Sequence, residues 1–286
     1  MNPLNFKTWL QNFKGSSSSP LVMGIMNITP DSFFSSSRHQ SINTVLKAAE
    51  KMIDEGVDII DIGAESTRPG SIPIDVETEL KRVIPVITAL RHHFDICLSI
   101  DTYKPMVMQA AIEVGANVIN DVTGLDNQQS IEIIKKYDIP VCMMHISGTL
   151  ADMSEPFQKQ DNVIKKIMQF YNDRLIDLKK QNFPMKNLIL DPGIGFGKQC
   201  ADNLKIIHDI QSLCDLNFPV LLGVSRKRFI GEVLDKPIDE RLLGSLSAQV
   251  VGFCNGCRIF RTHDVSATRE TLQIAEAIKN SYKGSI

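Results

Sequence analysis

The stretch NLILDPGIGFGK, residues 187–198, joins a short apolar run to a polar residue and a glycine-rich loop. Leu188, Ile189 and Leu190 have the composition of a buried strand, and Asp191 stands where that strand should end. Three glycines then alternate with other residues up to Lys198. The same order, an apolar run that ends in a polar residue and leads into a loop, recurs along the chain. This recurrence decides the fold.

The unit occurs eight times, with apolar runs that read PLVMGIMN, GVDIIDIG, DICLSID, ANVINDV, IPVCMMH, NLILDPG, FPVLLGVS and CRIFRTHD. Patterns of helical period separate them, over residues 41–55, 75–91, 105–114, 128–136, 161–180, 202–213, 240–252 and 265–279. Runs rich in Val, Ile and Leu with few alternating polar positions are typical of parallel strands covered on both faces. Eight such units in 286 residues favour an α/β fold, the (β/α)8 TIM barrel.

A doubly wound open sheet would give the same alternation of strands and helices, and it is the alternative fold. We favour the barrel because the count is eight and because the first strand lacks a glycine-rich dinucleotide turn. The serine-rich run before the first strand indicates a flexible approach to the barrel, without a domain linker. We therefore expect residues 1–20 to be an N-terminal lead-in and residues 21–286 to form a single barrel domain.

Composition narrows the class of protein. The net charge of −2 and the pI near 6.3 give no basic footprint for nucleic acid. The six cysteines lack the spacing of a disulfide framework, which is typical of reduced thiols. The N-terminus has no apolar core of signal-peptide length, and no stretch approaches the roughly 20 apolar residues of a membrane helix. We expect a cytoplasmic protein with no nucleic-acid or membrane partner.

Polar residues mark every predicted strand end: Asn27, Asp61, Asp101, Asn120, Asp121, His145, Asp191, Ser225, Lys227, Arg261 and His263. In a barrel these ends converge on one mouth, where barrel enzymes build their sites. Each residue taken alone could cap the following helix or close a turn. Helix capping alone does not explain why all eight strand ends are polar, or why two of them carry a positively charged residue. The pattern predicts a binding site at the mouth.

The glycine loop after Asp191 resembles a phosphate-binding loop but fails both tests for one. A Walker loop would need glycine where Pro192 stands and Ser or Thr where Gln199 stands, and a dinucleotide fingerprint would need glycine in place of Lys198. The glycines either form a tight turn or let the backbone approach a flat ligand closely, with Phe196 offering a face to stack on. In the second case the carboxylate of Asp191 would accept hydrogen bonds from an amidine-like or guanidine-like edge.

Seven ordered motifs resemble those of the dihydropteroate synthase family: GIMNITPDSFF, DIGAESTRPG, LSIDTYKP, VINDVTG, LDPGIGFGK, GVSRKRFIGE and FRTHDV. The resemblance runs from about residue 21 to the last helix. It implies an enzyme that joins (7,8-dihydropterin-6-yl)methyl diphosphate to 4-aminobenzoate and releases diphosphate, with Mg²⁺ and as a homodimer. It departs from the family's common pattern at Arg228, where some members have Ser, and after the fifth strand, which ends in MMHISG.

The resemblance also implies a role for individual residues. The pterin contacts would be Asp101, Asn120, Val122, Met144, Asp191, Phe196, Gly223 and Lys227. The diphosphate contacts would be Asn27, Thr67, Arg68, Arg261, Thr262 and His263. The aminobenzoate contacts would be Phe33, Thr67, Pro69, Lys227 and Arg228. Catalysis would fall to Asp101, Lys227, Arg261 and His263. Asn27 would meet Mg²⁺, and because a neutral amide is a weak anchor the ion should arrive mainly with the diphosphate.

The loops over residues 28–40 and 63–74 are long and rich in Ser, Gly and Pro, and we expect them to act as lids. Two other functions compete: a pterin-binding barrel that transfers a methyl group to a corrinoid, and a paralogue that binds pterin without catalysis. Neither needs the arginine and histidine residues expected to bind anions. We expect His145 to be structural, and we expect the pair Cys254 and Cys257 to hold neither a metal nor a redox function.

Overall fold

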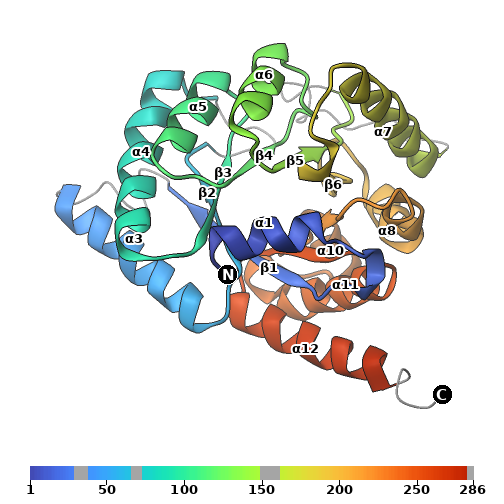
Figure 1. Ribbon diagram of the computed structural model, residues 1–286. Helices are drawn as coiled ribbons and strands as arrows, with labels where there is room; N and C mark the ends of the chain where they lie inside the picture. Colours follow the sequence, from blue (N-terminus) through green and yellow to red (C-terminus); the bar gives the residue numbers. More distant parts are fainter. Residues whose placement is uncertain (29–37, 66–72, 149–161, 282–286) are drawn as a thin grey trace.

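The computed structural model of the protein describes residues 1–28, 38–65, 73–148 and 162–281, with the backbone alone for residues 38–41 (Figure 1). Within these residues eight strands form one sheet: β1 (Leu21–Asn27), β2 (Ile59–Gly63), β3 (Cys97–Asp101), β4 (Val118–Asp121), β5 (Val141–Met144), β6 (Leu188–Asp191), β7 (Leu221–Leu222) and β8 (Ile259–Thr262). The order is β6-β5-β4-β3-β2-β1-β8-β7, and every pairing is parallel.

The two ends of this order meet. The amide of Leu190 in β6 donates to the carbonyl of Pro219 at 2.9 Å, and a parallel bridge joins Leu190 to Val220, directly before β7. The sheet therefore closes on itself, which confirms the predicted barrel; the open doubly wound sheet was the wrong alternative. Each of the eight predicted strands is present within the run that predicted it.

Helices cover the outside of the barrel (Figure 1). The predicted ones are α3 (Arg38–Asp54), α4 (Val76–His93), α5 (Pro105–Glu113), α6 (Gln128–Tyr137), α7 (Val163–Lys180), α8 (Cys200–Asp209) with the short α9 (Gln211–Cys214), α11 (Leu242–Cys254) and α12 (Val265–Ser281). The sequence did not predict α1 (Pro3–Gln11) or the 3₁₀ turns η1 (Gly15–Ser17), η3 (Met185–Asn187) and η4 (Ile238–Glu240), and for α10 (Arg228–Leu234) it predicted only a helix start beside Lys227. α10 has seven residues and each 3₁₀ turn has three, too few for a helical period to stand out, and in α1 only Phe6 and Leu10 are fully buried.

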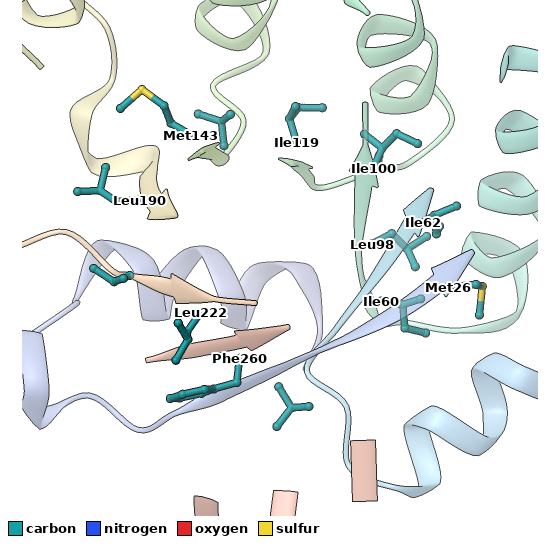
Figure 2. Close-up of a cluster of buried hydrophobic side chains, with 14 of the residues drawn as sticks. Met26, Ile60, Ile62, Leu98, Ile100, Ile119, Met143, Leu190, Leu222 and Phe260 are labelled. Atoms are coloured by element: carbon teal, nitrogen blue, oxygen red, sulfur yellow. The ribbon is translucent and has the colours of Figure 1, made fainter. Parts of the chain in front are cut away.

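Side chains of each strand alternate between the two faces of the sheet. One set points outward and packs against the helices; Figure 2 shows Ile60, Leu98 and Leu222 among this set. The residues between them therefore point into the barrel. This alternation decides which polar residues can reach the mouth.

The amino end of the barrel interior is apolar and closed. Its residues come from all eight strands, two from β1 and one from each of the others: Leu21, Met23, Ile59, Cys97, Val118, Cys142, Ile189, Leu221 and Ile259. Phe6 and Leu10 of α1 pack against them, and the amide of Cys97 donates to the carbonyl of Met1 at 2.9 Å. The expected lead-in thus contains a helix that plugs this end. Among the described residues, the plug fills the amino end of the interior, so we look for a ligand site at the carboxyl end.

Candidate active site at the carboxyl ends of the strands

The site begins two residues beyond the apolar plug. Asp61 follows Ile59, Asp191 follows Ile189 and Arg261 follows Ile259, each at the period of two that keeps a side chain inside the barrel. Asn120 follows Val118 in the same way, and Asp101 lies one further step along β3. Asp61 is fully buried, and Asp101 and Asp191 are each 8% exposed. These five of the predicted strand-end residues therefore meet in one buried polar layer.

Arg261 lies between two carboxylates. It donates through Nε to Oδ2 of Asp61 at 2.7 Å and through Nη2 to Oδ2 of Asp101 at 2.8 Å. Asn120 donates to the same oxygen of Asp61 at 3.1 Å. One guanidinium does not balance two ionised carboxylates. Oδ1 of Asp61 and Oδ1 of Asp101 are also buried and have no hydrogen-bond partner in the described residues, so both remain available as acceptors.

Burial sets the electrostatics of this cluster. It raises the pKa of Asp101 to about 7; the charge of Arg261 opposes the rise, and that of Asp61 adds to it. Burial lowers the pKa of Arg261, but Asp61 and Asp101 outweigh it and the pKa is raised, so Arg261 stays charged. The family's motifs assign Asp61 no role, and the sequence marks it only by its place at a strand end. Its period-two spacing from Ile59 was the signal that marked it as a partner in the site.

Asp191, Phe196 and Lys227 form an adjoining wall. Lys227 Nζ lies 4.8 Å from the centre of the Phe196 ring and donates to the carbonyl of Ile194. Burial lowers the pKa of Lys227 to about 8, against the charge of Asp191. Burial also raises the pKa of Asp191, and the charge of Lys227 opposes this. The wall combines a carboxylate, a cation and an aromatic face.

The glycine loop has a structural explanation. Gly193, Gly195 and Gly197 have φ values of +64°, +80° and +68°, the left-handed region that favours glycine. A Cβ on Gly193 would stand 2.0 Å from the carbonyl oxygen of His145. The amide of Gly193 donates to Oδ1 of Asp191 at 2.7 Å, and that of Gly195 donates to Asn203 Oδ1 at 2.7 Å. These amides are already used inside the protein and do not form a phosphate cradle.

Two side-chain pairs join the loop after β7 to the loop after β8. Ser225 Oγ lies 3.0 Å from His263 Nδ1 and accepts the His263 amide at 3.1 Å. Arg226 donates to both carboxylate oxygens of Asp264, at 3.0 and 2.6 Å. Because Ser225 Oγ already accepts a backbone N–H, its hydroxyl can donate to Nδ1, which directs the imidazole proton to Nε2. The pairs orient His263 and the backbone that precedes Lys227.

Residues 23–263 match a family described as pterin binding enzymes. The dihydropteroate synthase of Haemophilus influenzae is 40% identical over 263 residues, which cover 92% of this chain and 95% of that protein. The chain belongs to the dihydropteroate synthase family.

Two solved structures of the family are similar to the fold. The dihydropteroate synthase of Xanthomonas albilineans with 4-aminobenzoic acid has a TM-score of 0.84 at 38% identity, over 91% of this chain and 93% of that one. The Clostridium difficile enzyme in the presence of pteroic acid has a TM-score of 0.85 at 36% identity, over 93% and 98% of the two chains. Dihydropteroate synthases are transferases that make dihydropteroate. Membership favours this activity over methyl transfer to a corrinoid.

The other residues that the family's motifs assign to substrate contacts differ in their positions. Val122 and Met144 are buried beside the polar layer, a Cβ on Gly223 would stand 3.8 Å from Lys227 Nζ, and Asn27 is exposed at the end of β1. The Thr262 hydroxyl faces α12, where it accepts from Thr268 Oγ1 at 3.0 Å, so its backbone would have to make any diphosphate contact.

Arg228 is exposed and donates to Glu232 at 2.5 Å. The expected contacts Phe33, Thr67, Arg68 and Pro69 lie outside the described residues, as do the greater parts of both expected lids.

The ring of His145 and the cysteine pair lie apart from the ligand-facing groups. Burial lowers the pKa of His145 to about 3, so the ring is neutral, and it packs edge-on against Phe170 with ring centres 5.1 Å apart. Cys254 is exposed and Cys257 is buried, and both are free thiols. In the described part of the chain no group of three or more His, Cys, Asp or Glu side chains is arranged to hold a metal ion. None of the described helices combines the length and apolar content needed to cross a membrane.

Proposed function

We propose that this chain condenses (7,8-dihydropterin-6-yl)methyl diphosphate with 4-aminobenzoate, giving 7,8-dihydropteroate and diphosphate. The proposal is carried by the buried Arg261–Asp61–Asp101 cluster, in a barrel from this family, where two buried carboxylate oxygens have no hydrogen-bond partner among the described residues. A buried acceptor without a partner is costly unless a ligand supplies the donor. A pterin, with several N–H groups on a flat ring, is such a ligand.

The pterin ring is proposed to stand against the Phe196 face, with its 2-amino-4-oxo edge toward Asp191. The carboxylate accepts from the donor-rich edge, while Asn120 and Lys227 supply donors to other ring atoms. Val122, Met144 and Gly223 complete the slot, together with Asp101 at its side. A site built on paired polar groups discriminates strongly against analogues that leave them unpaired.

The diphosphate is proposed to lie at the rim between β1 and β8. Arg261, His263 and Asn27 are the described candidates, and Thr67, Arg68 and the Thr262 backbone complete the set. The oxygen ligands at this rim fit Mg²⁺ only in part. The Asn27 amide oxygen is a hard ligand, but the carboxylates of Asp61 and Asp101 accept hydrogen bonds from Arg261. Mg²⁺ would therefore be held mainly by the diphosphate, where its charge would help to neutralise the leaving group.

The reaction breaks the bond between the pterin methylene carbon and the diphosphate oxygen, and the electron pair leaves with diphosphate. Arg261 and His263 stabilise that negative charge, and ionised Asp101 stabilises the positive charge left on the pterin. The amine nitrogen of 4-aminobenzoate then forms a bond to the methylene carbon and loses a proton. Arg261 thus links the two charges, because it contacts Asp101 while it faces the departing anion.

The second substrate is proposed to enter above the Lys227 wall, with Phe33, Thr67 and Pro69 over its ring. Lys227 and Arg228, at the start of α10, are proposed to bind its carboxylate through their positive charges. We also infer a homodimer through the late helices, supported by exposed apolar side chains on α11 and α12, namely Leu243, Val251, Ile274 and Ile278. A cytoplasmic location and a single barrel domain complete the proposal.

The test is to mix the purified protein with the pterin diphosphate and 4-aminobenzoate and to measure diphosphate and dihydropteroate together. We expect the two products in equal amounts and only when both substrates are present. Pterin binding in a calorimeter without any turnover would instead identify the non-catalytic paralogue. Light scattering of the same sample tests the homodimer.

A further inference from the structure

We propose that Lys198 is a positioning residue for the pterin slot, because its ammonium group is held in a cage of three backbone carbonyls that fixes the glycine loop. The inference rests on the proposed function in that the loop is taken to be a wall of the slot. Lys198 itself touches no substrate in this proposal.

The cage is defined by three contacts. Lys198 Nζ donates to the carbonyls of Gly193 at 2.8 Å, Phe196 at 3.0 Å and His145 at 3.1 Å. Burial lowers the pKa of Lys198 to about 7, and the charge of Asp191 opposes this. In its charged form the ammonium has three N–H donors, and each has one acceptor. The left-handed glycines let the loop curl so that the carbonyls of Gly193 and Phe196 point at its own lysine. This is the reverse of a phosphate loop, where amides point inward.

Each carbonyl in the cage belongs to a part of the slot. Gly193 gives its amide to Asp191, Phe196 is the aromatic face, and His145 directly follows Met144 at the end of β5. Lys198 therefore ties the ends of β5 and β6 together around Asp191. Lys227 takes the carbonyl of Ile194 from the same loop, so two lysines hold this turn through different carbonyls.

The ammonium has a second effect on Asp191. Burial raises the pKa of that carboxyl, and the charges of Lys227 and Lys198 and the amide of Gly193 oppose the rise. A caged cation thus favours the ionised carboxylate, which accepts hydrogen bonds with both oxygens. Without it the slot would lose both its shape and part of the negative charge proposed to meet the pterin.

The experiment is a chemical rescue. In Lys198→Ala the carbonyls remain and the ammonium is gone, so a small cation with N–H donors can refill the cage. Pterin affinity is measured by calorimetry in ammonium, methylammonium or tetramethylammonium chloride at equal ionic strength. Lys198→Met fills the space with an apolar chain and cannot be rescued. Lys7→Ala is the matched control, since Lys7 also bridges two segments, to Asp138 Oδ2 at 2.9 Å, but at the plugged end.

We expect Lys198→Ala to bind pterin roughly tenfold more weakly or worse, as follows from loss of charge-assisted hydrogen bonds. The KM for pterin diphosphate should rise more than the KM for 4-aminobenzoate. Ammonium and methylammonium should restore part of the affinity, and tetramethylammonium, which has no N–H, should restore none. Lys198→Met should stay weak in every salt, and Lys7→Ala should bind as the wild type does.

Wild-type affinity in Lys198→Met or Lys198→Ala would overturn the proposal, and so would equal rescue by all three salts. If Lys198→Ala does not fold without salt, its melting temperature gives the same decision: ammonium should raise it and tetramethylammonium should not. The affinity and melting-temperature measurements do not depend on turnover. A wild-type protein that binds pterin but releases no diphosphate would contradict the proposed function. The role of Lys198 would then still be decided by the rescue experiment.

Discussion

The two ends of the barrel interior are built on the same strands but differ in polarity, in charge and in how fully their buried groups are paired. At the amino end, Ile59 and Ile189 pack in an apolar layer under α1. Two residues further along the same strands, Asp61 and Asp191 stand in a buried layer of charge. The first layer satisfies every requirement of a core. The second leaves buried carboxylate oxygens open and holds more negative than positive charge.

The difference indicates a division of labour. Burial of apolar groups makes the amino end a source of stability. Buried charges without full pairing cost stability, and such a cost is common where a site is shaped for a ligand. Substitutions at the two ends should therefore separate: those at the plug should change the free energy of unfolding, and those at the mouth should change binding and turnover. Four predictions test or sharpen this contrast.

Arg261→Ala should have the largest effect, at the mouth. It removes the cation that faces the leaving diphosphate, leaves Asp101 without its ion-pair partner and leaves Asp61 with Asn120 alone, so kcat/KM should fall by roughly 10³-fold or more. Affinity for pterin diphosphate should fall much more than affinity for a pterin without diphosphate. Arg258→Met is the control, because Arg258 is a fully buried arginine on the approach to the same strand, bonded to the carbonyls of Phe253 and Cys257. Equal losses for both ligands in Arg261→Ala would mean that Arg261 has a structural role only.

Phe6→Ala should have the next largest effect, at the plug. Phe6 is 1% exposed under the barrel, and the cavity left by its removal should lower the free energy of unfolding by about 3–5 kcal/mol. KM for both substrates should not change in the folded protein. Leu4→Ala, on the same helix at 73% exposure, should cost almost nothing. Urea unfolding and steady-state kinetics on both variants are the measurements. A changed pterin affinity in Phe6→Ala would contradict the claim that the amino end of the barrel contributes stability and not substrate binding.

Asp101→Asn should have a smaller effect that depends on pH. Because burial raises the folded-state pKa of Asp101 to about 7, the wild type gains stability as pH falls from about 7 toward its unfolded-state pKa near 4. Asparagine cannot take up this proton. At pH 8 the variant should be at least as stable as the wild type, and by pH 5.5 its relative stability should drop by on the order of 1 kcal/mol. Urea unfolding of both proteins across this range is the measurement, and a difference that does not vary with pH would contradict the burial argument.

The sequence predicts the strands and their polar ends because both are local signals. Runs such as NLILD carry their length, their apolar content and their terminal carboxylate within five residues. The plug by α1 was missed because this short helix buries only Phe6 and Leu10 fully, with Trp9 partly buried beside them. Asp61 and Arg261 lie 200 positions apart, and their pairing depends on closure of the whole barrel.

The lysine cage was missed for a related reason. The sequence places Lys198 beside the glycines but does not show which way the carbonyls of a left-handed turn will point. The expected contacts Phe33, Thr67, Arg68 and Pro69 remain predictions from the family's motifs.

The measurement that tests the central claim most directly is the affinity of Asp191→Asn for a pterin. The change replaces one carboxylate acceptor by a donor at the wall of the slot while keeping the shape of the side chain. We predict a loss of roughly 10²-fold in pterin affinity, with the free energy of unfolding kept or raised. An unchanged pterin affinity, with the fold intact, would contradict the assignment of the carboxyl end of the barrel as the pterin site.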